Sequence, residues 1–161
     1  MTTQIAPGLI WFAATDKFSA VLAMCAAAYS GVRHQRLLVM APEYLLVADE
    51  LDSRIARRFD WLYHQRGSLK RESVPMTSVD FNRVPLIIAS RTGRSVRFIA
   101  VIEPMRKGEE WGELMVTGAP VDNGGYRIIL KRMGLADVIT LMPDRSCTVA
   151  RGGNILLEGK Q

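Results

Sequence analysis

The side chains best suited to chemistry are few in this sequence and lie far apart. It contains two histidines, His34 and His64, and two cysteines, Cys25 and Cys147. Neither histidine stands in a spacing such as H-x-H or H-E-x-x-H, and a zinc site needs three or four ligands. A glycine-rich phosphate loop and a serine-nucleophile elbow are also missing. We therefore expect no intrinsic metal site and no cofactor.

The densest group of reactive side chains lies between residues 57 and 66. On a strand, alternate side chains point to opposite faces, so Phe59, Trp61 and Tyr63 share one face. The opposite face takes the intervening residues Arg58, Asp60, Leu62 and His64. The aromatic row is either a sugar-stacking platform or part of a sandwich core, and the core is favoured because large aromatics at period two usually face inward. His64 is either a proton-transfer group at a saccharide cleft or a structural histidine.

A second pair of charged residues follows from a predicted hairpin. Ala41–Tyr44 contains Pro42 at the second position of a type I turn. If the hairpin is centred between Pro42 and Glu43, Arg36 lies opposite Asp49. Opposite charges across a ladder stabilise each other, so we expect a salt bridge that fixes the register more than a direct ligand contact.

Short apolar runs separated by turn residues predict the elements that carry these side chains. The pattern indicates an all-β fold, an antiparallel β-sandwich of about a dozen strands in a single domain spanning residues 1–161. Gly152-Gly153 and the segment Met133–Ala136 predict further chain reversals. The alanine-rich segment Phe18–Ala27 is assigned to a strand although its alanines favour a helix. The predicted strands are Leu9–Ala13, Phe18–Ala27, Gln35–Ala41, Tyr44–Glu50, Ala56–His64, Leu86–Ser90, Val96–Ile102, Leu114–Thr117, Tyr126–Arg132, Val138–Met142, Cys147–Ala150 and Asn154–Leu157.

The first hairpin is apolar at consecutive positions, in LLVMA (37–41) and YLLVA (44–48). Both faces of that part of the sheet should therefore be covered. A two-sheet sandwich covers one face. Extra strands of this chain, a second copy or a missing domain would have to cover the other.

Composition narrows the class of partner. The chain has 161 residues and a formal charge of +5, from 21 Lys and Arg against 16 Asp and Glu. A mild basic excess attracts polyanions, but the many interspersed acidic residues argue against a dedicated nucleic-acid binder. No segment has the length of a membrane span, and the N-terminal stretch lacks the basic residues of a signal peptide. We expect no nucleic-acid partner and no membrane partner.

Four segments, taken in order, resemble the β-sandwich region of the heparinase II/III-like polysaccharide lyases. They are Tyr29–Arg36, Tyr44–Leu51, Phe59–His64 and Val96–Pro104. The resemblance covers most of the chain from about Leu9 onward and points to the C-terminal region of those enzymes. It implies kinship with enzymes that cleave acidic polysaccharide by β-elimination, and it suggests a periplasmic or secreted location.

In that family, a helical toroid supplies the catalytic tyrosine and histidine, and the zinc-binding residues lie upstream of the matched stretches. This sequence has no counterpart of either. We therefore expect a module that binds acidic polysaccharide or supports its cleavage, inactive as an isolated chain, with the catalytic groups on a partner domain. The candidate ligand-binding residues are Arg33, His34, Arg36, His64 and Arg66. One alternative is a stand-alone lyase that uses His64, the best catalytic candidate, with Tyr63 or Tyr29; another is a structural sandwich without saccharide binding.

Overall fold

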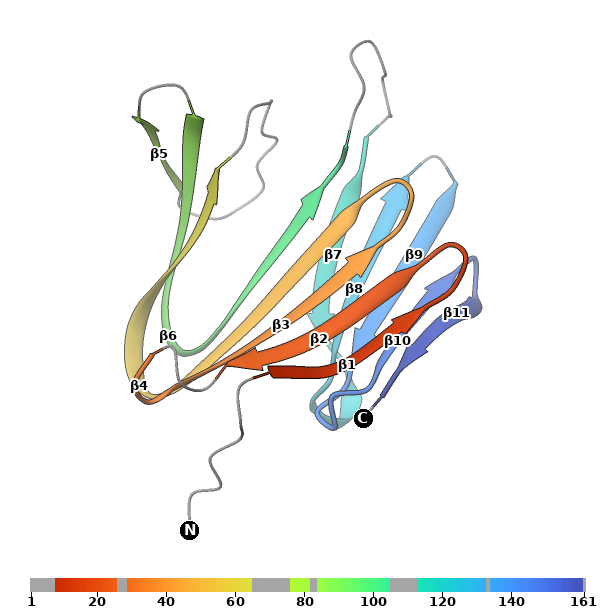
Figure 1. The fold of residues 1–161 in the computed structure, drawn as a ribbon, viewed down its shortest axis with the longest axis horizontal. Helices are drawn as coiled ribbons and strands as arrows, with labels where there is room; N and C mark the ends of the chain where they lie inside the picture. Colours follow the sequence, from red (N-terminus) through yellow and green to blue (C-terminus); the bar gives the residue numbers. More distant parts are fainter. Residues whose placement is uncertain are drawn as a thin grey trace.

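Eleven strands make up the described part of the chain in this computed structural model, which covers residues 8–25, 29–64, 76–81, 84–104, 113–132 and 134–160 (Figure 1). A short 3-10 turn, Asp122–Gly124, interrupts them. The strands are β1 Gly8–Ala14, β2 Ser19–Cys25, β3 Val32–Met40, β4 Leu45–His64, β5 Met76–Phe81, β6 Val84–Ile102, β7 Met115–Pro120, β8 Tyr126–Arg132, β9 Leu135–Leu141, β10 Cys147–Arg151 and β11 Asn154–Gly159.

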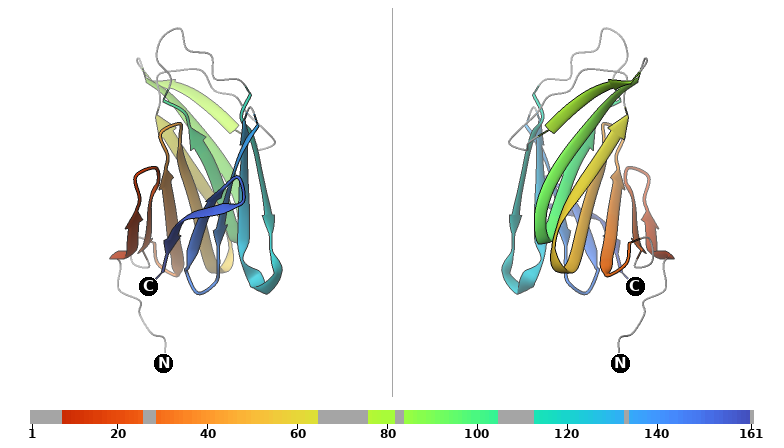
Figure 2. Two further views of the ribbon diagram at one scale, coloured as in Figure 1. Left: turned by 90° about the vertical axis from the view of Figure 1, so that its right-hand side faces the viewer. Right: turned by 90° about the vertical axis from the view of Figure 1, so that its left-hand side faces the viewer.

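Two antiparallel sheets pack face to face, as the sequence predicts (Figure 2). The first sheet has the strand order β1-β2-β3-β4-β6-β5, and the second has the order β11-β10-β9-β8-β7. Two pairs of predicted strands are each continuous in the structure, because β4 joins Tyr44–Glu50 to Ala56–His64 and β6 joins Leu86–Ser90 to Val96–Ile102. The sequence did not predict β5. The predicted all-β sandwich is confirmed, and Phe18–Ala27 forms a strand over Ser19–Cys25.

The three predicted chain reversals are also confirmed. The Ala41 N–H donates to the Tyr44 carbonyl at 2.9 Å, which closes the turn between β3 and β4. Gly152 and Gly153 have φ values of 58° and 85°, the left-handed conformations that a primed hairpin turn requires. The third reversal joins β8 to β9, where Arg132 pairs with Leu135.

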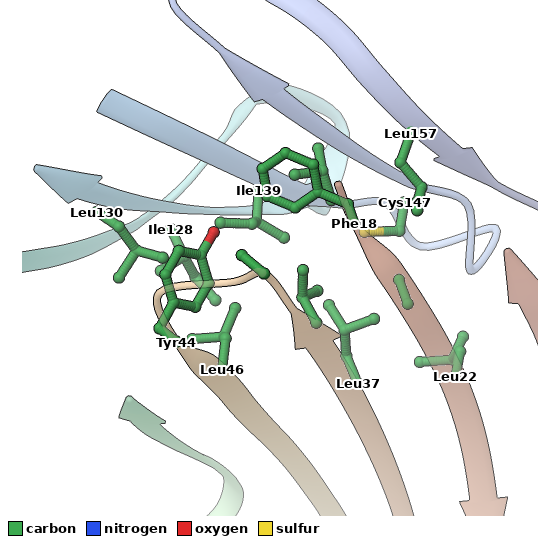
Figure 3. Close-up of a cluster of buried hydrophobic side chains, with 14 of the residues drawn as sticks. Phe18, Leu22, Leu37, Tyr44, Leu46, Ile128, Leu130, Ile139, Cys147 and Leu157 are labelled. Carbon is green, nitrogen blue, oxygen red and sulfur yellow. The ribbon is translucent and has the colours of Figure 1, made fainter. Parts of the chain in front are cut away.

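The core lies between the two sheets and takes one face of each strand (Figure 3). Alternate side chains of β2, β3 and β4 enter it from the first sheet, and those of β8, β9, β10 and β11 enter from the second. Its fully buried members include Phe18, Leu22, Leu37, Val39, Leu46, Ile139, Cys147 and Val149. Burial raises the pKa of the Cys147 thiol to about 12, so this cysteine is an apolar core residue.

The first sheet curls so that part of its outer face is covered by its own strands. The ends of β4 and β6 that join β5 turn back from the rest of the sheet (Figure 1). Phe59 and Ala89 from these ends form a second buried cluster with Leu51 and Phe98. No member of this cluster belongs to the doubly apolar hairpin, so the cover of its outer face stays a prediction. Within the described residues, no helix is long and apolar enough to cross a membrane.

Candidate functional site

Arg36 and His34, two of the predicted ligand-binding residues, converge on one buried carboxylate. β3 and β4 pair with Arg36 opposite Asp49, so the predicted register is confirmed. Arg36 Nε donates to Asp49 Oδ1 at 2.6 Å and Nη2 donates to Oδ2 at 2.8 Å, while His34 Nε2 lies 2.8 Å from Oδ1. The Asp49 side chain is only 2% exposed. The pair therefore fixes the register of the sheet, and ligand contact by Arg36 and His34 stays a prediction.

The environment of Asp49 keeps it ionised. Burial by itself raises the pKa of this carboxyl, but hydrogen bonds from Arg36 and His34 outweigh that effect and hold the pKa below its ordinary value. The hydrogen bonds that Arg36 donates to Asp49, together with the negative charge of Asp49, raise the pKa of Arg36. The cluster is a closed arrangement of opposite charges on the outer face of the first sheet.

Arg33, the next predicted residue, lies on the opposite face of the sheet, at the end of the sandwich. Its guanidinium contacts the Asp52 carboxylate at 2.5 Å, and both side chains are partly exposed. Burial by itself raises the pKa of Asp52. Hydrogen bonds from Arg33 and Ser95 outweigh this effect, so the pKa lies below its ordinary value.

Polar residues replace the core at this end of the sandwich, in two rows that run across β3, β4 and β6. The register places Arg33, Asp52 and Ser95 in one row, and Gln35, Glu50 and Arg97 in the next. In the following row the apolar core begins, with Leu37, Ala48 and Ile99. The inner face of the first sheet is therefore apolar in the core between the sheets and charged at this end of the sandwich.

Arg97 connects this polar end to the second sheet. Its Nη2 lies 2.5 Å from Glu50 Oε1, and its guanidinium carbon lies 4.4 Å from the centre of the Tyr126 ring on β8. A guanidinium over an aromatic face is held there by the ring quadrupole. The two contacts fix Arg97 between the sheets while leaving it 36% exposed.

An open cleft of about 400 Å³ lies beside Arg97. It combines two arginines, two hydroxyl side chains and one aromatic ring, which are groups that can bind the anionic and hydroxyl groups of a sugar chain. Arg91 is exposed, and in the described part of the chain no carboxylate pairs with it. The residues that line the cleft are Arg91, Thr92, Ser95, Val96, Arg97 and Tyr126.

A solved structure shares this fold. The chain matches a heparinase III gene product with a TM-score of 0.63 and 12% sequence identity. The fold is that of a heparinase-like β-domain. The match covers 84% of this chain but only 27% of the other, so the chain corresponds to about a quarter of that protein. The sequence matches no protein-family profile, and no curated protein matches it.

The aromatic row divides between a buried cluster and the surface. Phe59 is buried in the second cluster and Trp61 packs against it, so both face inward onto apolar neighbours, but on the outer face of the first sheet and not in the core between the sheets. Tyr63 is half-buried and stacks on Trp61 with ring centres 5.5 Å apart. The backbone of His64 ends β4, but its side chain and all of Arg66 lie outside the described residues. Their predicted roles are untested.

The sequence reasoning missed a charged network that joins the two sheets. Arg151 on β10 binds the buried Asp137 through two hydrogen bonds of 2.7 and 2.8 Å, and it binds Glu43 in the β3–β4 turn at 3.0 and 3.2 Å. The Tyr44 hydroxyl donates to Asp137 at 2.9 Å, and the Arg151 guanidinium lies over the Phe18 ring. Burial and the charge of Asp137 raise the pKa of Tyr44, which keeps the hydroxyl protonated. These contacts serve the fold and leave no group free for catalysis.

Among the described residues, no group of three or more histidine, cysteine or acidic side chains is close enough to hold a metal ion.

Proposed function

We propose that this chain is the β-sandwich module of a heparinase-like polysaccharide lyase and that it binds acidic polysaccharide at the polar end of the sandwich. The observation that carries the proposal is the open cleft in which Arg91, with which no described carboxylate pairs, adjoins Arg97 and Tyr126. The likeness to a heparinase III gene product supports the same family of activities.

The chemistry of the cleft suits a chain of anionic sugars. Guanidinium groups bind carboxylate or sulfate through two parallel hydrogen bonds, and such charge-assisted bonds are stronger than neutral ones. The hydroxyls of Thr92 and Ser95 can bind sugar hydroxyls beside them. Arg33 lies in the same row as Ser95 and is paired with Asp52.

Cleavage by β-elimination would use catalytic groups from another domain. The reaction needs a base, an acid and a group that neutralises the uronate carboxylate, all around one sugar. His34 is held against Asp49, and the aromatic neighbours of His64 pack on one another. The role proposed here is therefore binding and support, with the stand-alone use of His64 as the alternative.

The outer face of the first sheet is the proposed contact surface for that catalytic domain. Phe12 and Met40 lie on this face and remain 64% and 57% exposed, beyond the part that Phe59 covers. Large exposed apolar patches commonly mark interaction sites. A second copy of this chain would cover the same face, and sedimentation of the isolated chain, which we expect to be monomeric, distinguishes the two.

Calorimetric titration tests saccharide binding. Acidic oligosaccharides should bind at low salt and more weakly at moderate salt, because screening weakens exposed ion pairs, whereas neutral oligosaccharides of equal length should not bind. Arg91→Ala should weaken binding several-fold. Arg127→Ala, which removes the same charge from an exposed position on β8, is the matched control and should leave binding unchanged.

The predicted residues outside the cleft are tested in the same titration. His64→Ala and Arg66→Ala should each weaken binding if these side chains reach the saccharide. Equal binding of acidic and neutral chains, or no binding of either, would leave only a structural role for the module.

A further inference from the structure

The first sheet bends sharply at an irregular point in the β4–β6 ladder. Asp52 pairs with Ser95 and Arg57 pairs with Gly93, so residues 53–56 of β4 face the single residue Arg94 of β6. Both strands change direction here before they run on toward β5 (Figure 1). Bulges of this kind redirect side chains and are frequent beside functional sites. Arg54 is one of these four β4 residues, so it lies beside Arg94 at this corner of the sheet.

The arginines at this corner differ from most others in the described structure. Elsewhere, arginines form ion pairs with nearby carboxylates, as in Arg33–Asp52, Arg36–Asp49, Arg58–Asp60, Arg97–Glu50 and Arg151–Asp137. At the bend, Arg54 and Arg94 are exposed, and no carboxylate among the described residues pairs with them or with Arg57. The bend therefore carries positive charge that no carboxylate among the described residues neutralises.

Arg57 adds a separate indication of a missing partner. Its Nε is buried and has no hydrogen-bond partner within the described structure. Buried donors are nearly always satisfied, by protein, water or a ligand. An acceptor bound at the bend would satisfy this one.

The bend and the cleft are continuous. The residues of β6 that line the cleft flank the bend on both sides, with Thr92 directly before Gly93 and Ser95 directly after Arg94. A glycan bound in the cleft therefore lies beside the bend. We propose that Arg54, Arg57 and Arg94 form a second anionic subsite, so that an acidic glycan runs from the cleft onto the bend.

This inference rests on the proposed function and specifies its ligand. The cleft holds one end of the glycan, and the bend holds anionic groups farther along the same chain. A ligand must therefore be long enough to span both sites and must carry carboxylate or sulfate groups on successive repeats. A disaccharide should occupy the cleft alone.

The test compares a disaccharide with a long chain of the same acidic repeat. Arg54→Ala combined with Arg94→Ala should lower the affinity for the long chain about tenfold, because two exposed ion pairs with the ligand are lost. It should also reduce the slope of log affinity against log salt by about two, one for each lost contact. Disaccharide binding should not change. Arg91→Ala should lower the affinity for both ligands.

The control removes two charges elsewhere, by Arg127→Ala combined with Lys160→Ala, both at exposed positions. It should leave the affinity for the long chain within about twofold and the salt slope unchanged, because only contacts with the ligand release counterions. Thermal unfolding of all variants checks that the exposed substitutions preserve the fold. Arg54→Lys combined with Arg94→Lys keeps the charge and should recover part of the affinity.

The outcomes separate the two proposals. If the unmodified chain binds no acidic glycan, the proposed function fails and the subsite fails with it. Suppose instead that the unmodified chain binds acidic glycan. If the bend variant then binds the long chain as tightly as the unmodified chain does, or loses as much affinity for the disaccharide as for the long chain, the second subsite is overturned while the proposed function stands. Equal affinity for single-stranded DNA of the same length would also overturn the subsite, because it would show general attraction to polyanions.

Discussion

At the scale of single residues, half of the arginines in the described part of the chain hold carboxylates in place. Asp49 is the clearest case, since a 2% exposed carboxylate is bound by Arg36 and lies against His34. An ionised group that is buried needs such partners, because removing it from water costs several kcal/mol. The cluster therefore locks the β3–β4 register.

Asp49→Asn should destabilise the fold by about 2 kcal/mol at neutral pH. This is less than the ~3–5 kcal/mol for fully buried pairs, because Arg36 is 45% exposed and water can solvate it. The depressed pKa of Asp49 means that its stabilisation is complete above the ordinary carboxyl range and is lost as the pH falls through that pKa.

Urea unfolding at neutral pH and at a series of acidic pH values measures both effects. The variant should show a shallower loss of stability on acidification than the unmodified chain. Asp16→Asn, at an exposed position, should change neither quantity. An Asp49→Asn variant as stable as the unmodified chain would show that the cluster does not hold the register.

At the scale of elements, contacts between sheet edges and turns close the sandwich. Trp11 of β1 enters the core and its indole N–H donates to the Arg145 carbonyl at 2.7 Å. The ring lies against Gly159 of β11, where an added Cβ would stand 2.4 Å from it. The missing side chain of Gly159 therefore allows the first and last strands to approach.

Gly159→Ala should cost about 2 kcal/mol of stability, because the ring or the strand must move to admit the methyl group. Chemical denaturation followed by tryptophan fluorescence measures the loss and reports on the indole at the same time. Glu158→Ala, at the adjacent exposed position, is the control and should be nearly neutral. Unchanged stability of Gly159→Ala would mean that this edge contact is loose.

At the scale of the whole molecule, apolar and charged surfaces lie in different places. The exposed apolar residues Phe12 and Met40 lie on the outer face of the first sheet. The arginines without a carboxylate partner in the described part of the chain include those at its bend and in the adjoining cleft. This separation suits a module that contacts a protein domain with one surface and an anionic glycan with another.

The isolated chain should not cleave heparin, heparan sulfate or alginate, since the proposed module depends on catalytic groups from elsewhere. Incubation with each polysaccharide, followed by ultraviolet absorbance of unsaturated uronate ends, measures this. Chain cleavage that disappears in His64→Ala would favour the stand-alone lyase instead.

The sequence by itself determined the features that depend on local order. Alternation of apolar residues indicated the strands, and the position of Pro42 set the hairpin symmetry that places Arg36 opposite Asp49. These relations follow from period two and from short turns, so neighbouring residues suffice to define them.

Only the tertiary structure decided how distant segments meet. Residues 51–55 and 91–95 are predicted to be breaks between strands, yet the strands continue through them as a bulged bend. The bend directs Phe59 onto the outer face of the sheet, and packing of the two sheets brings Arg97 onto Tyr126 and completes the cleft. Such contacts depend on the curvature and stacking of whole sheets, which the local alternation of residues does not encode.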